Sequence, residues 1–426
     1  MREFERVCVV GLGYVGLPLA VEFAKAGLDV TGIDLDEGKV RAIGEGRSLP
    51  PDVDAEALER ERLSGRLKVE ASYDPVEGSD AVIICVPTPL NPSREPDLSH
   101  VRSAAEEVEK RLPKGCLVVL ESTTYPGTTE EVLLPILSRG GRKVGEDFFL
   151  AYSPERIDPG RRDYTLRNTP KVVAGVTERC LERAVRLYSM VVERLVPVSS
   201  PKVAEMTKIF ENVFRNVNIA LVNELALLCH KMGISVWEVL DAAQTKPFGF
   251  TRFNPGPGVG GHCIPVDPFY LSWKAKQYNF RTRFIELAGE VNASMPEHVV
   301  QRIADILNER ERSVKGSRIL ILGVAYKRDC PDTRESPAID IIEGLMRRGA
   351  KVEYLDPWVP EIEVRGEILR SKGADESPWR EADLVVLVTD HSNFDYERIA
   401  GEAGLIFDTR NAFGSRGLKG DNIIPL

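Results

Sequence analysis

The sequence predicts an α/β protein in which two doubly wound, Rossmann-like domains are joined by a long central helix and a helical middle domain. Its 426 residues suffice for two or three domains. Short runs rich in Val and Ile alternate with helical patterns near the N-terminus, and this alternation returns in the last third of the chain. Between them the apolar residues keep a helical spacing. We expect a first domain over residues 1–200, a helical middle domain over 201–312 and a second doubly wound domain over 313–426.

The first domain opens with a strand, a helix and a strand. The run RVCVVG (6–11) is typical of a buried parallel strand, VGLPLAVEFAKAG (15–27) has helical periodicity, and DVTGID (29–34) is again strand-like. Two further apolar runs, at 80–87 and 116–122, continue the pattern. Helices between such strands indicate a parallel sheet that is covered on both faces.

A long helix is expected in the middle of the chain. From Val203 to Leu228 the apolar residues recur at helical spacing, with no internal Gly or Pro. A helix of this length suits a connection between domains or an interface between subunits, so we expect a homodimer or a higher homo-oligomer. A stretch rich in Pro and Gly follows at 254–268, and helical patterns then continue to about residue 312.

The last third repeats the order of the first domain. Strand-like runs occupy 315–323, 350–357, 382–390 and 404–410, and a helical pattern occupies 336–349.

The first loop of this repeat differs from its counterpart. Where the first domain has GLGYVG, the repeat has GVAYKRD, and we interpret the glycines of the motif as absent. Without them the backbone cannot approach a pyrophosphate closely, so this domain should bind something else. Lys327 and Arg334 in the loop favour an anionic ligand.

Composition excludes several classes of function. The chain has 56 Lys and Arg against 65 Asp and Glu, a net charge of −9, so no overall positive field would attract nucleic acid or an anionic membrane. No apolar stretch approaches the roughly 20 residues that span a bilayer, and the start does not resemble a signal peptide. We expect a cytoplasmic protein.

The seven cysteines are scattered, odd in number and never in a CxxC pair. This pattern argues against a disulfide framework and against a metal site, and it fits a reducing compartment. Cys8, Cys85, Cys116 and Cys229 lie in apolar runs, where a small buried side chain is expected. Cys263 differs, because it lies in the loop rich in Gly and Pro.

The motif Gly11-Leu-Gly13-Tyr-Val-Gly16 follows a strand and opens a helix, and Asp34 ends the next strand. Gly11 permits a tight turn, Gly13 permits close approach of a pyrophosphate, and Gly16 permits close packing of helix on strand. Asp34 can accept a hydrogen bond from a ribose 2′-hydroxyl and would repel a 2′-phosphate. The motif predicts NAD rather than NADP as cofactor, and a purely structural glycine turn is the alternative.

Cys263 is the strong nucleophile of a loop that begins with Gly260 and Gly261 and ends at Asp267. The glycines permit close approach of a ligand, and backbone N–H groups or a nearby cation would favour the thiolate. The alternative is a buried loop cysteine without chemistry. We interpret the neighbouring His262 as a hydrogen-bonded structural residue.

Lys208 and Asn212 lie four residues apart in the expected long helix, on one face with Glu205 and Asn216. An ammonium and a carboxamide together can stabilise an alkoxide or an oxyanion. A solvated polar face is the alternative, and it would be preferred without the cofactor motif and the loop cysteine.

Several stretches together resemble the UDP-glucose/GDP-mannose dehydrogenase family over nearly the whole chain: GLGYVGLPLA, CVPTPL, ESTTYPGTT, SPERIDPG, the helix with Lys208 and Asn212, PGPGVGGHCIPVDP and DTRESPA. Within the family, LNPSREPDLS, LESTTYPGTTEE, KVGEDFFLAYSPER and KPFGF most resemble the UDP-N-acetylglucosamine 6-dehydrogenase branch, which makes a uronic acid for surface polysaccharides. The UDP-N-acetylmannosamine dehydrogenases are close relatives of this branch.

The resemblance implies a four-electron oxidation of the sugar C6 alcohol to a carboxylate with two NAD⁺. The nucleophile of the family corresponds to Cys263, which would form a thiohemiacetal and then a thioester. Lys208 and Asn212 correspond to the pair that stabilises developing oxyanions, and Asp267 corresponds to an acid that assists proton transfer.

The resemblance also implies two binding sets and no metal. Thr123 and Glu155 correspond to residues that place water or contact cofactor and substrate. The implied cofactor set is Gly11, Gly13, Tyr14, Val15, Gly16, Asp34, Lys39, Thr88, Thr123, Val266 and Arg334. The implied UDP-sugar set is Glu155, Arg156, Lys208, Asn212, Arg252, Gly260, Lys327 and Arg410. In that set, Lys327 and Arg410 would meet the diphosphate and uridine.

The exact sugar is a finer question. Enzymes for UDP-glucose commonly carry a second Glu four residues after the position of Glu155, where this chain has Pro159. We therefore favour UDP-N-acetylglucosamine, with UDP-N-acetylmannosamine or UDP-glucose as the alternative. Arg156 in the same turn is a candidate for sugar recognition, and a surface salt bridge is its alternative.

Two other functions compete with this one. A two-electron β-hydroxyacid dehydrogenase also combines a Rossmann domain with Lys and Asn on a helix, but it leaves Cys263 and the last domain without a role. A non-catalytic NAD-binding sensor would not need Cys263, Lys208 and Asn212 together. Counting the NADH released per UDP-sugar separates the three functions.

Overall fold

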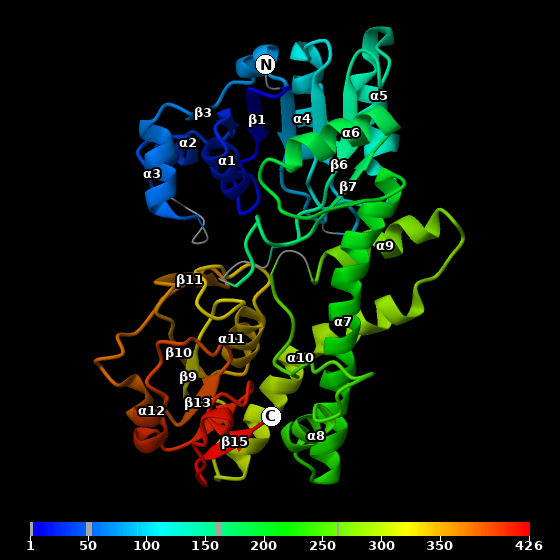
Figure 1. Ribbon diagram of the computed structural model, residues 1–426. Coiled ribbons are helices and arrows are strands. Elements are labelled where there is room, and N and C mark those ends of the chain that lie inside the picture. Colours follow the sequence, from blue (N-terminus) through cyan, green and yellow to red (C-terminus); the bar gives the residue numbers. More distant parts are fainter. Residues whose placement is uncertain (1–2, 48–52, 92, 158–162, 262–263) are drawn as a thin grey trace. The chain divides into compact units, whose positions relative to one another are not determined.

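The computed structural model describes residues 3–47, 53–91, 93–157, 163–261 and 264–426 (Figure 1). The chain divides into two compact units, Met1–Glu211 with Phe269–Phe280 and Asn212–Pro268 with Arg281–Leu426. Each unit has its own sheet and its own apolar core. The α/β fold class predicted from the alternation of strands and helices is confirmed.

The first unit is built on an eight-stranded sheet in the order β3-β2-β1-β4-β5-β6-β7-β8. Neighbouring strands are parallel except for β6 and β7, which are antiparallel. The strands are β1 (Arg6–Val10), β2 (Asp29–Ile33), β3 (Leu67–Glu70), β4 (Ala81–Ile84), β5 (Leu117–Leu120), β6 (Phe149–Tyr152), β7 (Lys171–Gly175) and β8 (Leu195–Pro197). The four strand-like runs of the N-terminal region thus lie in one doubly wound sheet, as β1, β2, β4 and β5.

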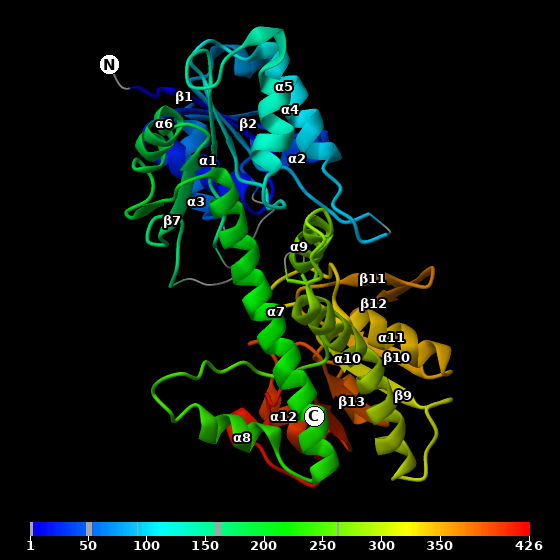
Figure 2. The same cartoon turned by 90° about the vertical axis from the view of Figure 1, so that its right-hand side faces the viewer.

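Helices cover both faces of this sheet (Figure 2). Along β1 the side chains alternate, and Val7 and Val9 share a core with Leu17 and Phe23 of the first helix. On that face lie α1 (Gly16–Lys25), α3 (Ala55–Leu63) and α6 (Glu178–Tyr188), whereas α4 (Ser99–Arg111) and α5 (Leu134–Leu137) lie on the other. The short helix α2 (Glu37–Gly44) follows β2, with Asp36 as its N-cap.

Helix α7 (Pro201–Met232) runs unbroken from the first unit into the second (Figure 2). It contains the whole predicted segment from Val203 to Leu228 and is a few residues longer at each end. Much of its apolar stripe is uncovered in the single chain, since Phe210 is 63% exposed and Leu221 is 62% exposed. The other helices of the middle region are α8 (Val236–Ala243), α9 (Asp267–Lys276) and α10 (Arg283–Asn308).

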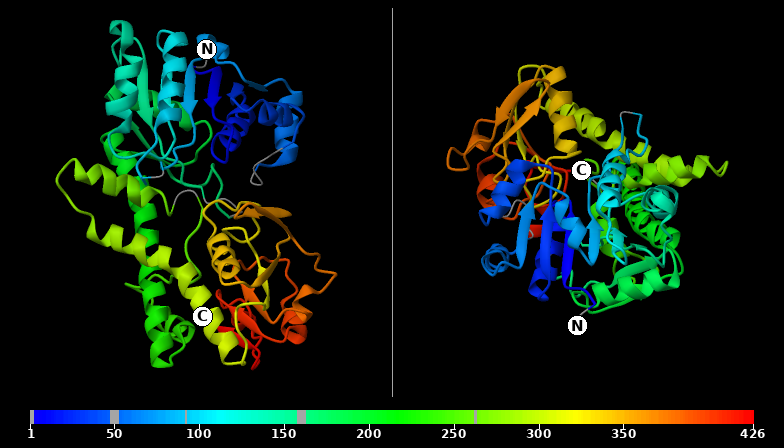
Figure 3. Two further views of the ribbon diagram at one scale, coloured as in Figure 1. Left: turned by 180° about the vertical axis from the view of Figure 1, so that it is seen from behind. Right: turned by 90° about the horizontal axis from the view of Figure 1, so that it is seen from above.

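The second unit carries a five-stranded parallel sheet in the order β10-β9-β13-β14-β15 (Figure 3, left, yellow to red). Its strands are β9 (Arg318–Leu322), β10 (Lys351–Leu355), β13 (Leu384–Leu387), β14 (Ile406–Asp408) and β15 (Ile423–Pro425). Helices α10 and α11 (Pro337–Arg347) pack on one face, and α12 (Tyr396–Glu402) packs on the other. The predicted second doubly wound domain is present.

A hairpin is among the elements of this unit that were not predicted. Strands β11 (Glu361–Val364) and β12 (Glu367–Arg370) form an antiparallel hairpin whose turn residues, Arg365 and Gly366, both have positive φ angles. Among the helices that the structure describes, none has the length and apolar character needed to cross a membrane.

Candidate active site

The glycine loop between β1 and α1 has the geometry that a pyrophosphate requires. Gly11 adopts a φ of +93°, and a Cβ there would lie 2.6 Å from the carbonyl oxygen of Cys85. A Cβ on Gly16 would overlap the carbonyl oxygen of Gly11, so this glycine lets α1 pack against the loop. A Cβ on Gly13 would have no atom of the described residues within 4 Å. The space at Gly13 is therefore open to a ligand.

Asp34 follows β2 beside this loop, where Tyr14 and Val15 are partly exposed. Its Oδ2 accepts hydrogen bonds from Leu12 N at 2.9 Å and from Lys39 Nζ at 2.8 Å. Burial acts to raise the pKa of Asp34, but the hydrogen bonds from Lys39 and the backbone outweigh burial and lower it. Asp34 is thus an ionised acceptor next to the glycine loop.

Thr88 and Thr123 follow β4 and β5 and are joined to each other. Thr88 Oγ1 donates to the carbonyl oxygen of Thr123 at 2.8 Å, and the Tyr270 hydroxyl donates to the carbonyl oxygen of Thr88 at 2.5 Å. Because parallel strands end at the same edge of a sheet, these threonines lie at the edge that carries the glycine loop. An open position at Gly13 and an ionised acid beside it fit NAD.

Glu155 follows β6, and both of its carboxylate oxygens are held. Oε1 accepts hydrogen bonds from Arg156 N and Ile157 N, each at 2.6 Å, and Oε2 lies 3.5 Å from Lys171 Nζ. Burial acts to raise the pKa of Glu155, yet the charge of Lys171, the two backbone donors and the charge of Lys208 lower it. Glu155 is therefore an ionised carboxylate, with 12% of its side chain exposed.

Lys208 is a half-buried residue of α7 in the same unit as Glu155. Within the described part of the chain its ammonium has no hydrogen bond and no ion pair. Its charge is nevertheless close enough to lower the pKa of Glu155. The structure thus brings together a carboxylate and an ammonium that the sequence had placed in the catalytic set.

Three further residues of this cluster were missed by sequence reasoning. Lys171 Nζ donates to Glu121 Oε2 at 3.1 Å, and the Tyr188 hydroxyl donates to Glu121 as well. Glu121 is fully buried, and the Lys171 side chain is 4% exposed. A signal was available in the sequence. Glu121 directly follows the buried strand β5, and Lys171 is the first residue of the buried strand β7, where an unpaired charge is not tolerated.

Arg156 is engaged by the protein itself. Its Nε and Nη2 contact the Glu211 carboxylate at 3.2 and 2.6 Å, and Nη1 donates to the carbonyl oxygen of Pro170 at 2.7 Å. This is the salt bridge that the sequence offered as the alternative for Arg156. A role in sugar recognition stays a prediction.

In the second unit, Asn212 and Asp267 form a buried pair. Asn212 Nδ2 donates to Asp267 Oδ2 at 2.5 Å, and both side chains are buried. Asn212 follows Lys208 by one turn of α7, and Asp267 is the first residue of α9. The amide of Asn212 has a second N–H, which can serve an oxyanion.

The glycine stretch before the predicted nucleophile packs against the second sheet domain. Gly256 N donates to Asn223 Oδ1 at 3.0 Å, and Gly261 N donates to the carbonyl oxygen of Arg334 at 3.0 Å. A Cβ on Gly260 would lie 2.7 Å from the carbonyl oxygen of Glu335. Only glycine fits so close to this backbone.

The predicted nucleophile Cys263 and its neighbour His262 lie outside the described residues. Val266, predicted for the cofactor, is buried in the same stretch.

The first loop of the second sheet domain requires one correction. Gly323 has a φ of +80°, and a Cβ there would overlap the carbonyl oxygen of Thr389. A Cβ on Gly11 would meet the carbonyl oxygen of Cys85 in the same way. The first glycine of the motif is therefore retained, because the strand-to-helix turn needs it whether or not a ligand binds. The prediction that all its glycines are absent was wrong for Gly323.

Asp356, the acid beside this second loop, has hydrogen-bond partners within the protein at both carboxylate oxygens. Asp356 Oδ2 accepts hydrogen bonds from Val324 N at 2.7 Å and Ala325 N at 3.0 Å, and it lies 3.0 Å from His391 Nε2. His391 Nδ1 accepts from Asp329 N at 2.9 Å, so the ring proton is on Nε2 and faces Asp356. Asp356 has the place in this loop that Asp34 has in the first.

Arg410 lies after β14 and presents a half-buried cation in the same unit. Its Nε donates to the carbonyl oxygen of Val388 at 2.9 Å, and a Cβ on Gly256 would lie 2.6 Å from its Nη1. Burial lowers the pKa of Arg410 to about 10. Arg410, predicted for the UDP site, is thus adjacent to Gly256, which lies four residues after the predicted Arg252.

The other predicted cations differ in their surroundings. Arg252 pairs with Asp241, and Arg334 pairs with Asp332 at 2.6 Å. Lys327 is half-buried in the loop after β9. These residues lie in the second unit, and their roles stay predictions.

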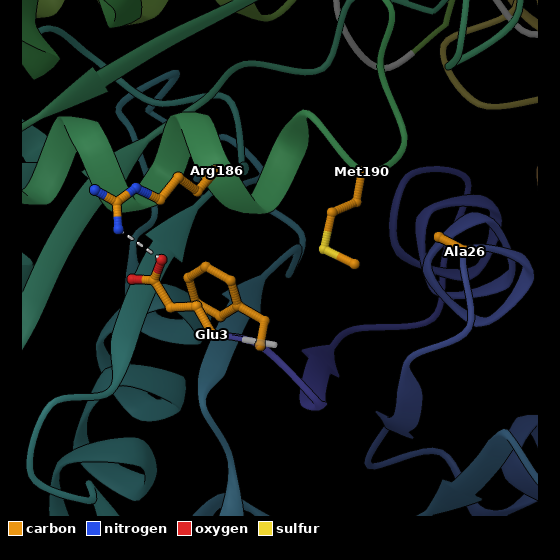
Figure 4. A pocket seen from close by; sticks show the side chains of 5 residues that line it. Glu3, Ala26, Arg186 and Met190 are labelled. Carbon is orange, nitrogen blue, oxygen red and sulfur yellow. Dashed lines mark hydrogen bonds and ion pairs between the residues drawn. The ribbon is translucent and has the colours of Figure 1, made fainter. Parts of the chain in front are cut away.

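A surface pocket of the first unit is unrelated to this site. It is lined by Glu3, Phe4, Ala26, Arg186 and Met190, with Glu3 bonded to Arg186 at 2.9 Å (Figure 4). None of the predicted site residues lines it.

Comparison with known families shows which family the chain belongs to. The models of the UDP-glucose/GDP-mannose dehydrogenase family match in chain order: the NAD binding domain over residues 5–192, the central domain over 202–294 and the UDP binding domain over 320–415. The chain belongs to this family. It is an NAD-dependent oxidoreductase that acts on a nucleotide sugar. Each matched range lies inside one of the three domains expected from the sequence.

The enzyme is similar to several characterised relatives. It is 40% identical to the UDP-N-acetyl-D-glucosamine 6-dehydrogenase of Pseudomonas aeruginosa over 356 residues, 83% of each chain. It is 37% identical to the UDP-N-acetyl-D-mannosamine dehydrogenase of Pyrococcus horikoshii, over 91% of this chain and 90% of that one. A solved structure of the UDP-D-ManNAc dehydrogenase from P. horikoshii has a TM-score of 0.88 at 33% identity, covering 99% and 98% of the two chains.

Proposed function

We propose that the enzyme oxidises C6 of UDP-N-acetyl-D-glucosamine to a carboxylate, consuming one water and two NAD⁺ and releasing two NADH and three protons. The observation that carries the reaction type is the Lys208 ammonium, which has no partner among the described residues and lies near the ionised Glu155 carboxylate. Both residues belong to the unit that contains the glycine loop of the predicted NAD site. The choice of sugar is supported by the relative at 40% identity that bears this substrate in its name.

The proposed first oxidation needs a group that stabilises an alkoxide. As the C6 hydroxyl loses its proton, the Lys208 ammonium and the second N–H of Asn212 can both donate to the oxygen. Bound NAD⁺ supplies the hydride acceptor in each of the two oxidations. Asn212 is held in place by Asp267, so its donor direction is fixed before the substrate arrives.

The second oxidation requires a tetrahedral carbon that still bears a hydrogen. In the proposal the Cys263 thiolate adds to the aldehyde and gives a thiohemiacetal, and loss of its hydride gives a thioester. Water then attacks the thioester, and the thiolate leaves as the carboxylate forms. Glu155, an ionised acceptor, is suited to orient that water and take its proton.

The covalent step is tested by replacing Cys263. We expect Cys263→Ser to bind NAD⁺ normally but to lose steady turnover, because a hydroxyl is hardly ionised near neutral pH and is a poor leaving group. The measurements are NADH per UDP-sugar and intact mass, which would reveal a trapped ester. Near-normal release of two NADH by both Cys263→Ser and Cys263→Ala would exclude the covalent route.

UDP-N-acetyl-D-mannosamine is the second candidate substrate. The similarity to the P. horikoshii enzyme, in sequence and in structure, favours it specifically. A panel of UDP-GlcNAc, UDP-ManNAc, UDP-GalNAc and UDP-glucose, compared by kcat/KM from NADH release, separates the candidates. We expect UDP-GlcNAc to give the highest value, and a higher value for UDP-ManNAc would overturn the choice of sugar.

A further inference from the structure

We propose that Lys171 is a positioning residue that keeps Glu155 ionised and correctly oriented for attack of water on the thioester. The proposal rests on the function proposed above, and it assigns a role to a buried cation that the reaction scheme does not otherwise use. Lys171 itself would touch neither the substrate nor the cofactor.

The contacts of the Lys171 ammonium carry this inference. The ammonium has three N–H donors, and three acceptors surround it: Glu121 Oε2 at 3.1 Å, the carbonyl oxygen of Pro154 at 3.4 Å and Glu155 Oε2 at 3.5 Å. It also lies 5.2 Å from the centre of the Tyr188 ring. If Lys171 served only to neutralise Glu121, it would not need to reach the Glu155 segment at two points.

The orientation of Glu155 follows from these contacts. Its Oε1 is fixed by the backbone donors of Arg156 and Ile157, and its Oε2 faces Lys171. A carboxylate held at both oxygens cannot rotate freely, and Oε2, which has one donor, keeps a further lone pair. The partly exposed side of Glu155 can therefore accept a water in a constant direction.

The charge balance of the cluster makes Glu155 sensitive to Lys171. The groups that face Glu155 or its partners come from the ends of β4 and β5, from β7 and from α6 and α7: Cys85, Glu121, Lys171, Tyr188 and Lys208. Burial acts to raise the pKa of Glu155, and the charge of Lys171 is the largest effect that lowers it. The Glu121 carboxyl competes for the same ammonium, and burial, together with the charge of Glu155, raises the pKa of Glu121.

Two substitutions should therefore shift the ionisation of Glu155 in opposite directions. Lys171→Met removes the counter-charge, so the acid limb of the kcat profile should move to higher pH by roughly one unit or more. Glu121→Gln removes the competing carboxylate and leaves Lys171 to Glu155, so the limb should move to lower pH. A merely structural role would give both variants lower stability and no opposite shifts.

The experiment records kcat against pH from NADH release for the full-length enzyme. Lys171→Arg keeps the cation and should restore the wild-type limb. Lys110→Met removes a surface lysine that pairs with Glu107 at 2.5 Å, and as the matched control it should leave the limb unchanged. Because ionisation of Cys263 also contributes to this limb, Lys171→Met is repeated in a Glu155→Gln background, where its effect should vanish.

Folding of the variants is checked by thermal melting and NAD⁺ binding. If Lys171→Met does not fold, the double variant with Glu121→Gln removes both buried charges and should show the same upward shift. Carboxyl carbon-13 NMR of the wild-type enzyme is an independent measurement. A Glu155 that titrates at or above its ordinary 4.5, or an unmoved limb in a folded Lys171→Met, overturns the proposal.

An incorrect proposed function would give a different experimental result from an incorrect role for Lys171. The pH profile can be recorded with any nucleotide sugar that the wild-type enzyme oxidises, so a wrong choice of sugar leaves this test intact. A wild-type yield other than two NADH per sugar would reject the proposed reaction, whatever the profile of Lys171→Met.

Discussion

At the residue scale, we expect the ion pair between Asp34 and Lys39 to govern the choice of cofactor. The Asp34 carboxylate occupies the Lys39 ammonium, which is then not available to a 2′-phosphate. We predict that Asp34→Ser lowers kcat/KM for NAD⁺ by roughly tenfold or more and raises it for NADP⁺. The substitution removes the ribose acceptor and also leaves Lys39 without this partner. Initial rates with both cofactors at saturating sugar measure the change.

A second substitution separates the two effects. Adding Lys39→Met to Asp34→Ser should abolish the gain with NADP⁺ and keep the loss with NAD⁺. Equal use of the two cofactors by the wild-type enzyme would contradict the role of Asp34.

The residues that could be predicted from sequence are those whose geometry is local. Gly11 and Gly16 are needed by a turn within a few residues of themselves, so their spacing was sufficient. Glu121 and Lys171 are 50 residues apart in the chain, and strand β6 lies between their strands in the sheet. Their pairing follows from the strand order, which the sequence pattern did not specify.

At the scale of elements, Glu205 ties helix α7 to the segment that precedes and begins the π-helix η2 (Thr129–Leu133). Its Oε2 accepts a hydrogen bond from Gly127 N at 2.5 Å, and its Oε1 accepts from Thr129 N at 2.9 Å and from the Thr129 hydroxyl at 2.7 Å. Burial raises the pKa of Glu205 to about 7, although these donors act in the opposite direction.

This contact predicts a pH-dependent stability. Because the pKa of Glu205 is higher in the folded chain than its ordinary 4.5, its stabilising contribution is complete below that value and is lost as pH rises through 7. Between about pH 5 and pH 8 the group should cost roughly 3 kcal/mol of unfolding free energy. Glu205→Gln should flatten the fall in Tm over this range.

The control for this prediction is Glu224→Gln, a change at an exposed carboxylate of the same helix. It should leave the pH dependence of Tm as in the wild type. If Glu205→Gln retained the wild-type slope, the carboxyl would not titrate as described.

At the scale of the whole molecule, the uncovered stripe of α7 predicts self-association. Phe210, Leu221, Leu228 and Met232 are each more than half exposed in the single chain, and they recur along one helical face. We predict a dimer whose two-fold interface includes this stripe, so that light scattering gives about twice the 47.3 kDa of one chain.

Leu221→Glu should shift this dimer toward monomer at micromolar concentrations, because a charge would be buried in the interface. Arg215→Glu, also on α7 but away from the stripe, is the matched control and should remain dimeric. A wild-type mass near 47.3 kDa at all micromolar concentrations would contradict the prediction.

Most of the architecture could be predicted because two sheets were visible as alternating strand and helix patterns. The antiparallel direction of β7 could not, since the direction of a strand depends on its partners in the sheet, and β11 and β12 have only four residues each, too few to show a period. The length of α7 was apparent from its unbroken pattern, but a pattern cannot specify which face stays uncovered. Spacing predicted that Lys208 and Asn212 share one helix, which α7 confirms, whereas the partners of Glu155 required the fold.

The acids Asp34 and Asp356 have corresponding places after β2 and β10 but make different contacts. Asp34 receives one backbone N–H from its glycine loop, whereas Asp356 receives two and also faces a neutral histidine. The Asp356 carboxylate thus holds its own loop through Oδ2, and its Oδ1 accepts hydrogen bonds from Trp358 N and Val359 N. A loop that is held at five points by one carboxylate keeps its shape through the protein's own groups, with no dinucleotide needed to order it.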